Sequence, residues 1–187
     1  MIRDALVVGI NSYIYSSKAN QLEAPANDAE LIAQRLEEQG FWHVRRLPLA
    51  LTKSGKSKVN SKKNLTLREL KTAIEDLFYP QTKRNKPDAA LLYFSGHGLR
   101  DPGRRRSEGF LAASDVNPED ERWGISLRWL RELLQDSPIP TQIIWLDCCH
   151  AGELLEFDEG NPGGQGQTAR DRCFIAASQD HEFAYGA

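Results

Sequence analysis

Two short segments of the 187-residue sequence place a histidine or a cysteine among small and polar residues. Residues 93–98 read YFSGHG, and residues 147–152 read DCCHAG. A cysteine is a strong nucleophile as the thiolate, and a histidine imidazole can move its proton near neutral pH. Cys149 and His97 are therefore candidates for the nucleophile and the base of a reaction that proceeds through a covalent intermediate.

The alternation of side chains along a strand separates the two neighbouring cysteines. Asp147 and Cys149 are expected to point to one side of the sheet and Cys148 to the other. Ser95 and His97 likewise share one side. If the two strands are neighbours, these four polar side chains face one cleft, and Cys148 packs beneath the sheet.

The elements that must position these residues are short apolar strands that alternate with amphipathic helices. Strands are predicted at residues 5–10, 43–47, 89–95, 142–147 and 172–177. Helices are predicted at residues 27–39, after Thr66, and at 126–134. Such a pattern is typical of an α/β fold in which helices cover both faces of a parallel sheet. In these sheets the functional site lies at the carboxyl ends of the strands, where both motifs fall.

Local signals mark the helix ends and one long loop. Asn27 with Glu30, and Thr66 with Glu69, have the spacing of capping boxes, and Gly40 is expected to end the first helix. The lysine-rich residues 52–64 have no apolar period. We expect a solvated loop there, with a basic binding surface as the alternative.

Composition and charge exclude several functional classes. The net charge of −2 gives no general attraction to nucleic acid, and no apolar run has the length of a membrane span. The cysteines, Cys148, Cys149 and Cys173, are odd in number and do not have zinc-ligand spacing. We therefore expect a cytoplasmic protein with no nucleic-acid or membrane partner.

YFSGHG and DCCHAG resemble the two signature motifs of the caspase-like clan (peptidase C14), in particular those of the metacaspases and their prokaryotic relatives, the orthocaspases. The resemblance extends to the opening strand and to residues 27–29, 109–115 and 174–178. It implies a caspase-like three-layer sandwich with a mostly parallel central sheet. It also implies that His97 is the base, that Cys149 is the nucleophile, and that the backbone N–H groups of Gly98 and Cys149 form the oxyanion hole.

The same resemblance implies a cysteine endopeptidase that cleaves proteins and peptides after Arg or Lys. The positions that match the acidic substrate pocket are Asp28, Ser95 and Asp147. Two carboxylates at the floor of a pocket attract a guanidinium and repel an acidic side chain. Asp28 has a second interpretation, because a carboxylate in the first turn of a helix is favoured by the helix dipole.

We expect one catalytic domain over residues 1–187. It would comprise a large-subunit-like part to about residue 157, a flexible loop at about 158–170, and the start of a small-subunit-like part at 171–187. The family domain usually continues through another helix and strand, so we expect this last part to be incomplete, and further domains downstream in a longer chain are left open. Arg170 and Arg172 follow the Gly-rich loop and are candidate self-cleavage sites, with simple solvent exposure as the alternative.

Two questions stay open at this point. No cofactor is expected to be required, but the acidic residues Asp115, Glu119, Asp120 and Glu121 leave calcium possible, although their spacing matches no EF-hand loop. The alternative to a peptidase is a catalytically weak or inactive caspase-like interaction module.

Overall fold

A parallel sheet forms the centre of the computed structural model, which describes residues 1–17, 21–80, 86–101, 108–151 and 171–176. Within these residues the sheet has five strands in the order β10–β9–β5–β1–β2, and every neighbouring pair is parallel. The strands are β1 (Arg3–Gly9), β2 (His43–Leu47), β5 (Ala89–Ser95), β9 (Thr141–Asp147) and β10 (Asp171–Ala176). The sequence predicted all five to within about two residues at each end.

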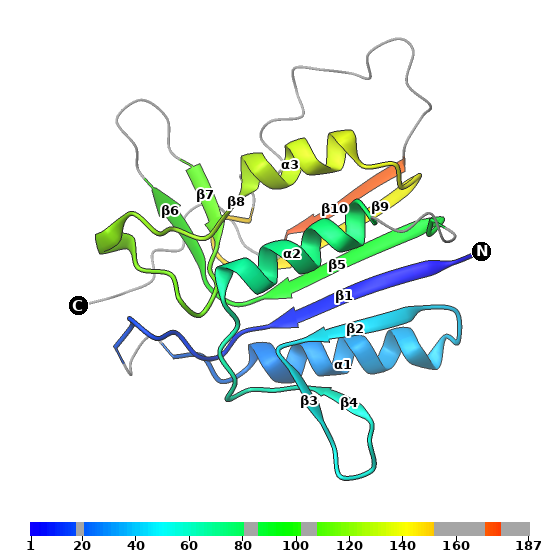
Figure 1. Cartoon of the computed structure of the whole chain (residues 1–187), viewed down its shortest axis with the longest axis horizontal. Coiled ribbons are helices and arrows are strands. Elements are labelled where there is room, and N and C mark those ends of the chain that lie inside the picture. The colour runs from blue at the N-terminus through cyan, green and yellow to red at the C-terminus, as the bar shows by residue number, and fades with distance from the viewer. Residues whose placement is uncertain (18–20, 81–85, 102–107, 152–170, 177–187) are drawn as a thin grey trace.

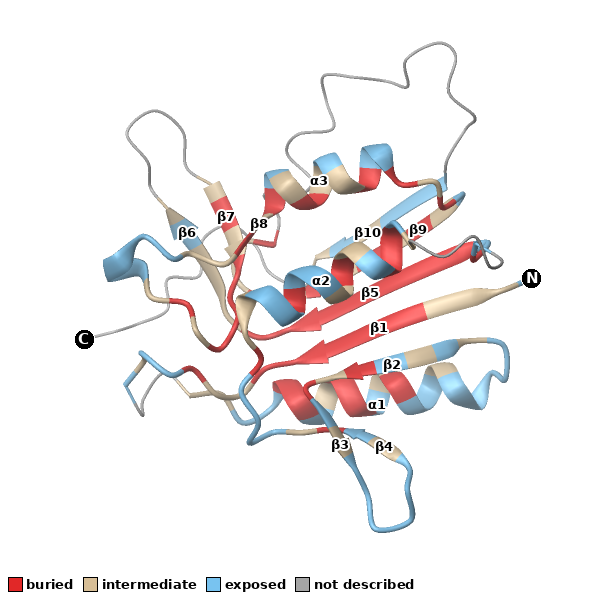
Figure 2. Ribbon diagram, in the orientation of Figure 1, coloured by how far each residue is buried: buried red, intermediate tan, exposed pale blue. Residues whose placement is uncertain are grey.

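Helices cover both faces of this sheet (Figure 1). The helix α1 (Pro25–Glu38) packs on one face, and α2 (Leu67–Phe78) and α3 (Leu127–Asp136) pack on the other. β1 and β5 are buried between the two helical layers along most of their length (Figure 2). The expected α/β three-layer sandwich is therefore confirmed. None of the described helices is both long enough and apolar enough to cross a membrane.

A small antiparallel sheet lies beyond the carboxyl ends of β1 and β5 (Figure 1). Its strands are β6 (Gly98–Asp101), β7 (Glu108–Leu111) and β8 (Ile125–Ser126), and the 3₁₀ helix η2 (Pro118–Asp120) lies between β7 and β8. β6 begins three residues after β5 ends, so the chain passes directly from one sheet into the other through Gly96 and His97.

The start of α1 differs from the prediction. The helix begins at Pro25 rather than Asn27, and its N-cap is Ala24, which makes no side-chain hydrogen bond. Proline favours the first helical position because its fixed φ is already helical and its missing N–H is not needed there. The cap comes from outside the helix, because the Asn11 Oδ1 accepts a hydrogen bond from the Ala26 N–H at 2.8 Å.

The other two helices begin as the sequence indicates. Thr66 and Glu69 form the complete capping box at the start of α2, and the Ser126 side chain accepts from the Trp129 N–H at the start of α3. The apolar side chains of α2 and α3 then face the sheet and form one core with it. Local chemistry and the hydrophobic period agree in these two helices.

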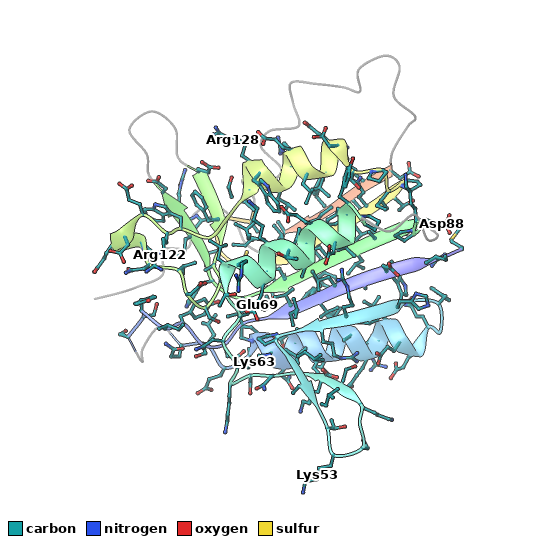
Figure 3. The ribbon with its side chains drawn as sticks, viewed as in Figure 1. Lys53, Lys63, Glu69, Asp88, Arg122 and Arg128 are labelled. Carbon is teal, nitrogen blue, oxygen red and sulfur yellow. The ribbon has the colours of Figure 1, made fainter. Side chains whose placement is uncertain are left out.

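The expected loop at residues 52–64 is partly wrong, because a hairpin occupies its first half. β3 (Leu49–Leu51) pairs antiparallel with β4 (Ser57–Val59), and Gly55 has a φ of 79° in the turn. Strands of three residues are too short to show a period in the sequence. The lysines remain exposed as predicted, with Lys53 near the tip of the hairpin and Lys63 near the start of α2 (Figure 3).

A buried ion pair connects the hairpin, β2 and α1. The Arg46 side chain is 2% exposed, its Nε lies 3.2 Å from the Glu30 carboxylate, and its terminal nitrogens bond to Glu37 at 2.6 and 2.8 Å. Glu30 also accepts a hydrogen bond from the Val59 N–H at 2.9 Å. Glu30, predicted as part of a capping box, therefore holds Arg46 and the hairpin instead.

We predict that Arg46→Ala lowers the free energy of unfolding by about 3 kcal/mol, because it leaves the buried Glu30 carboxylate without its counter-charge. Urea denaturation measures this change. Arg35→Ala is the matched control. The Arg35–Glu38 pair is exposed on α1, the helix that carries Glu30, and contributes about 0.5 kcal/mol. Equal losses in the two variants would contradict the prediction.

Candidate active site

The two motifs meet at the carboxyl ends of neighbouring strands. β5 pairs with β9 along its whole length, and this register places Ser95 directly opposite Asp147. The segments that contain His97 and Cys149 therefore leave the sheet side by side. The expected neighbouring position of the two strands is confirmed.

The two adjacent cysteines have different surroundings. Cys148 is 7% exposed and lies in the core on the side of α2 and α3, whereas Cys149 is half-buried at the turn after β9. Burial, followed by the nearby Cys149 and Asp147, raises the pKa of the Cys148 thiol. Cys148 therefore stays a neutral thiol. Its predicted place beneath the sheet is confirmed.

The turn that presents Cys149 is tight. His150 has a φ of 60°, in the left-handed region that side chains other than glycine seldom adopt. On the facing segment, a Cβ added to Gly98 would overlap the Cys149 carbonyl group. Only glycine lets these two backbones come so close, and this contact brings the residue after His97 against the candidate nucleophile.

Backbone contacts hold His97 on both sides. Its N–H donates to the Tyr13 hydroxyl at 2.7 Å, and its C=O accepts from the Ala112 N–H at 3.0 Å. The imidazole also packs on the Tyr13 ring, with 4.6 Å between ring centroids and a tilt of 50°. His97, which lies between β5 and β6, is therefore held by residues from two other segments of the chain.

The three expected pocket residues come together around Tyr93. The Ser95 hydroxyl and the Tyr93 hydroxyl both donate to Asp147 Oδ2, at 3.3 and 3.4 Å. Burial, then Asp147, and to a smaller extent Asp28, raise the pKa of Tyr93. Asp28 is thus close enough to act on the same hydroxyl. Asp28 also lies in the first turn of α1, as the helix-dipole interpretation requires, although it is not the N-cap of that helix.

Two tyrosines at the site were not singled out from the sequence. Tyr93 carries a signal that could have found it, because it precedes Ser95 by two residues and must share its side of the strand. Tyr13 carries none. It lies in an irregular segment 84 residues before His97, and only the tertiary structure brings the two together.

The comparison with known protein families decides the family. The model of the caspase domain (peptidase C14) matches residues 2–186. The chain belongs to this family. Its members are cysteine peptidases, and the observed parallel sheet with two helical layers is the caspase-like fold.

Comparison with solved structures supports the fold but says nothing of the function. No curated protein matches this caspase-domain chain. The crystal structure of protein GSU0716 from Geobacter sulfurreducens is similar to it, with a TM-score of 0.53 and 18% sequence identity. The match covers 80% of this chain and 51% of that chain, so the caspase domain described here matches about half the length of that protein.

The remaining predicted residues are those for self-cleavage and for calcium. Arg170 falls outside the described residues, whereas Arg172 lies in β10 and its guanidinium bonds to Gln142 Oε1 and to the Leu134 C=O, both at 3.0 Å. In the acidic segment, Asp115 accepts from the Leu67 N–H and Asp120 pairs with Arg122. Across the parts of the chain that the structure describes, no three acidic, histidine or cysteine side chains group to hold a metal ion.

We predict that the native protein exposes Cys149 but not Cys148 to Ellman's reagent at pH 8. The raised pKa and the burial of Cys148 keep it as an inaccessible thiol at that pH. A Cys149→Ser/Cys173→Ser variant should show no reactive thiol until it is denatured. The matched Cys148→Ser/Cys173→Ser variant should react without denaturant, and the reverse order would contradict the assignment of faces.

Proposed function

We propose that this caspase domain is a cysteine endopeptidase that works through a dyad of Cys149 and His97. The observation that carries the proposal is the contact between Gly98 and the Cys149 backbone, which joins the two motifs at one point. Cys149 is half-buried at a tight turn, and its backbone adjoins Gly98, the residue after a histidine whose backbone is held by Tyr13. A thiol and a histidine brought to one place in this way support thiol catalysis.

The dyad accounts for both halves of peptide hydrolysis. The Cys149 thiolate attacks the scissile carbonyl carbon while His97 carries the proton, and the oxyanion that forms accepts hydrogen bonds from the backbone N–H groups of Gly98 and Cys149. Collapse of this intermediate breaks the C–N bond, and His97 gives its proton to the leaving amine. Water, deprotonated by His97, then attacks the acyl-enzyme and releases the carboxylic acid and the thiolate.

The substrate preference that we propose is for Arg or Lys before the scissile bond. Asp147 and Asp28 supply two negative charges around the Tyr93 hydroxyl. The Tyr93 and Ser95 hydroxyls both donate to Oδ2 of Asp147, so among the described residues neither of them occupies Oδ1, which can accept from a cationic side chain. An aspartate substrate would meet like charges at the same place.

Three finer parts of the proposal concern the setting of the enzyme. We propose a cytoplasmic location, because a thiolate nucleophile is kept reduced there. The steps above use no metal. Activity measured with and without a calcium chelator tests whether the enzyme depends on calcium. For self-processing we favour Arg170 over Arg172, since cleavage after Arg172 would require β10 to leave the sheet.

We predict that a fluorogenic peptide with Arg before the scissile bond is hydrolysed, and that Cys149→Ala or His97→Ala lowers kcat/KM by about 10³-fold or more. Cys148→Ala is the matched control, because it removes a thiol one residue away that lies on the other face. Its kcat/KM should stay above about one tenth of the wild-type value. Full activity without Cys149, or none with it, would overturn the dyad and favour an inactive interaction module.

We predict a second, separate effect on specificity. Asp147→Asn should lower kcat/KM for the Arg peptide about tenfold, as expected when a charge-assisted hydrogen bond of about 1.5 kcal/mol is lost. Asp76→Asn, an exposed carboxylate on α2, is the control and should have no effect. Faster cleavage after Asp than after Arg in the wild-type protein would refute the pocket while leaving the dyad intact.

A further inference from the structure

We propose that Tyr13 is a positioning residue for His97. Its hydroxyl holds the backbone of the catalytic histidine, and its ring supports the imidazole. The inference rests on the proposed function, because positioning matters to catalysis only if His97 is the base. It concerns a residue that belongs to neither motif.

Tyr13 can act as a support because it is itself held firmly. Its side chain is buried, with 3% of the residue exposed. Its N–H donates to Gln21 Oε1 at 2.8 Å, and its C=O accepts from Gln21 Nε2 at 2.9 Å. The next residue, Ile14, donates its N–H to the Ser114 C=O at 2.7 Å. The segment is thus fixed on both sides of the tyrosine.

The Tyr13 hydroxyl accepts the His97 N–H just after the chain leaves β5. The last regular contact there is the Ile10 N–H to the Ser95 C=O, at 3.0 Å. Two residues later the His97 N–H meets the Tyr13 hydroxyl, which in turn donates to the Ile10 C=O at 3.3 Å. The phenol therefore links the end of β1 to the backbone of His97.

The phenol has to stay neutral for this role, since a phenolate could not donate to Ile10. Burial raises the pKa of Tyr13, so it keeps its proton throughout the range in which a peptidase is assayed. Tyr13 is for the same reason no candidate for a general base. Its contribution is to geometry.

Gly96 completes the arrangement, because it leaves the space that the hydroxyl occupies. A Cβ on Gly96 would lie 2.7 Å from the Tyr13 hydroxyl oxygen and 3.3 Å from the nearest atom of the Phe94 ring. The first distance is too short for any real contact, whereas the second needs only a small shift. The steric clash caused by a methyl group at position 96 is therefore mainly with the hydroxyl oxygen of Tyr13.

The first test is Tyr13→Phe, which removes one oxygen and keeps the ring. We expect kcat for the Arg peptide to fall at least about tenfold, within the range known for small displacements of a catalytic group, with KM changed less than about twofold. Tyr15→Phe is the matched control on the same segment, since Tyr15 is 57% exposed, and it should leave both constants unchanged. An unchanged kcat in Tyr13→Phe would overturn the proposal.

The second test is a double-mutant cycle with Gly96→Ala. In the wild-type background this substitution should lower kcat about tenfold or more, because the methyl group displaces the hydroxyl. In the Tyr13→Phe background the same substitution should cost less than about threefold, since the clashing oxygen is gone. A general loss of stability would give additive effects instead, and additivity would count against the proposal.

The third test does not depend on activity. By NMR, the His97 amide should exchange with solvent at least about tenfold faster in Tyr13→Phe than in the wild-type protein, because its acceptor is lost. The amide of Leu6, in the middle of β1, serves as the internal reference. If the wild-type protein is inactive but the His97 amide still exchanges faster in Tyr13→Phe, the peptidase activity is refuted and the contact of Tyr13 with His97 stands. If the wild-type protein is active but the exchange rate of the His97 amide is the same in Tyr13→Phe, only the role of Tyr13 is refuted.

Discussion

The register between β5 and β9 is the constraint on which the rest of the site depends. It pairs Ser95 with Asp147, the last residues of the two strands, so the segments that follow β5 and β9 leave the sheet at the same level. The core side of β9, with Ile144, Leu146 and Cys148 all below 8% exposure, fixes that register. A slip of one residue would turn Asp147 into the core and Cys148 toward the cleft, because side chains alternate along a strand.

The site uses the two faces of the sheet for different purposes. Tyr93 belongs to the cluster that packs against α1, and Ser95 and Asp147 continue its side of the strands toward the first turn of that helix. Tyr13 and Cys148 belong to the core under α2 and α3. The carboxylates that would recognise substrate are thus grouped near α1, while the support for His97 comes from the opposite core. Gly98, at the start of β6, is where the segment that leaves β5 touches the Cys149 backbone.

Elements whose signals are local could be predicted from the sequence. The buried strands, the capping box at Thr66 and the separation of Cys148 from Cys149 all depend on residues within a few positions of one another. The start of α1 could not be predicted, because its capping group belongs to Asn11, 15 residues before the N–H that it accepts. Glu30 illustrates the same difficulty. Its spacing from Asn27 fits a capping box, but a buried arginine on β2 offers a stronger partner than a helix N-terminus.

The candidate site divides in the same way. Alternation and the motifs together brought His97, Cys149, Ser95 and Asp147 to one edge of the sheet. Tyr93 could have been found by the same reasoning carried two residues further back. Tyr13 could not, since its contact with His97 spans 84 residues and is made by an irregular segment with no period. The hairpin of β3 and β4 was missed because three-residue strands carry too little pattern to read.

The opposite orientation of Cys148 and Cys149 has a consequence for oxidation. Peroxide converts an accessible thiolate to a sulfenic acid, which a nearby second thiol can capture as a disulfide before further oxidation makes the damage permanent. Cys148 is adjacent in sequence but lies in the core on the other side of the sheet, so it cannot act as this resolving thiol. Cys148 therefore cannot reduce an oxidised Cys149, and a thiol other than Cys148, such as that of glutathione, would have to do so.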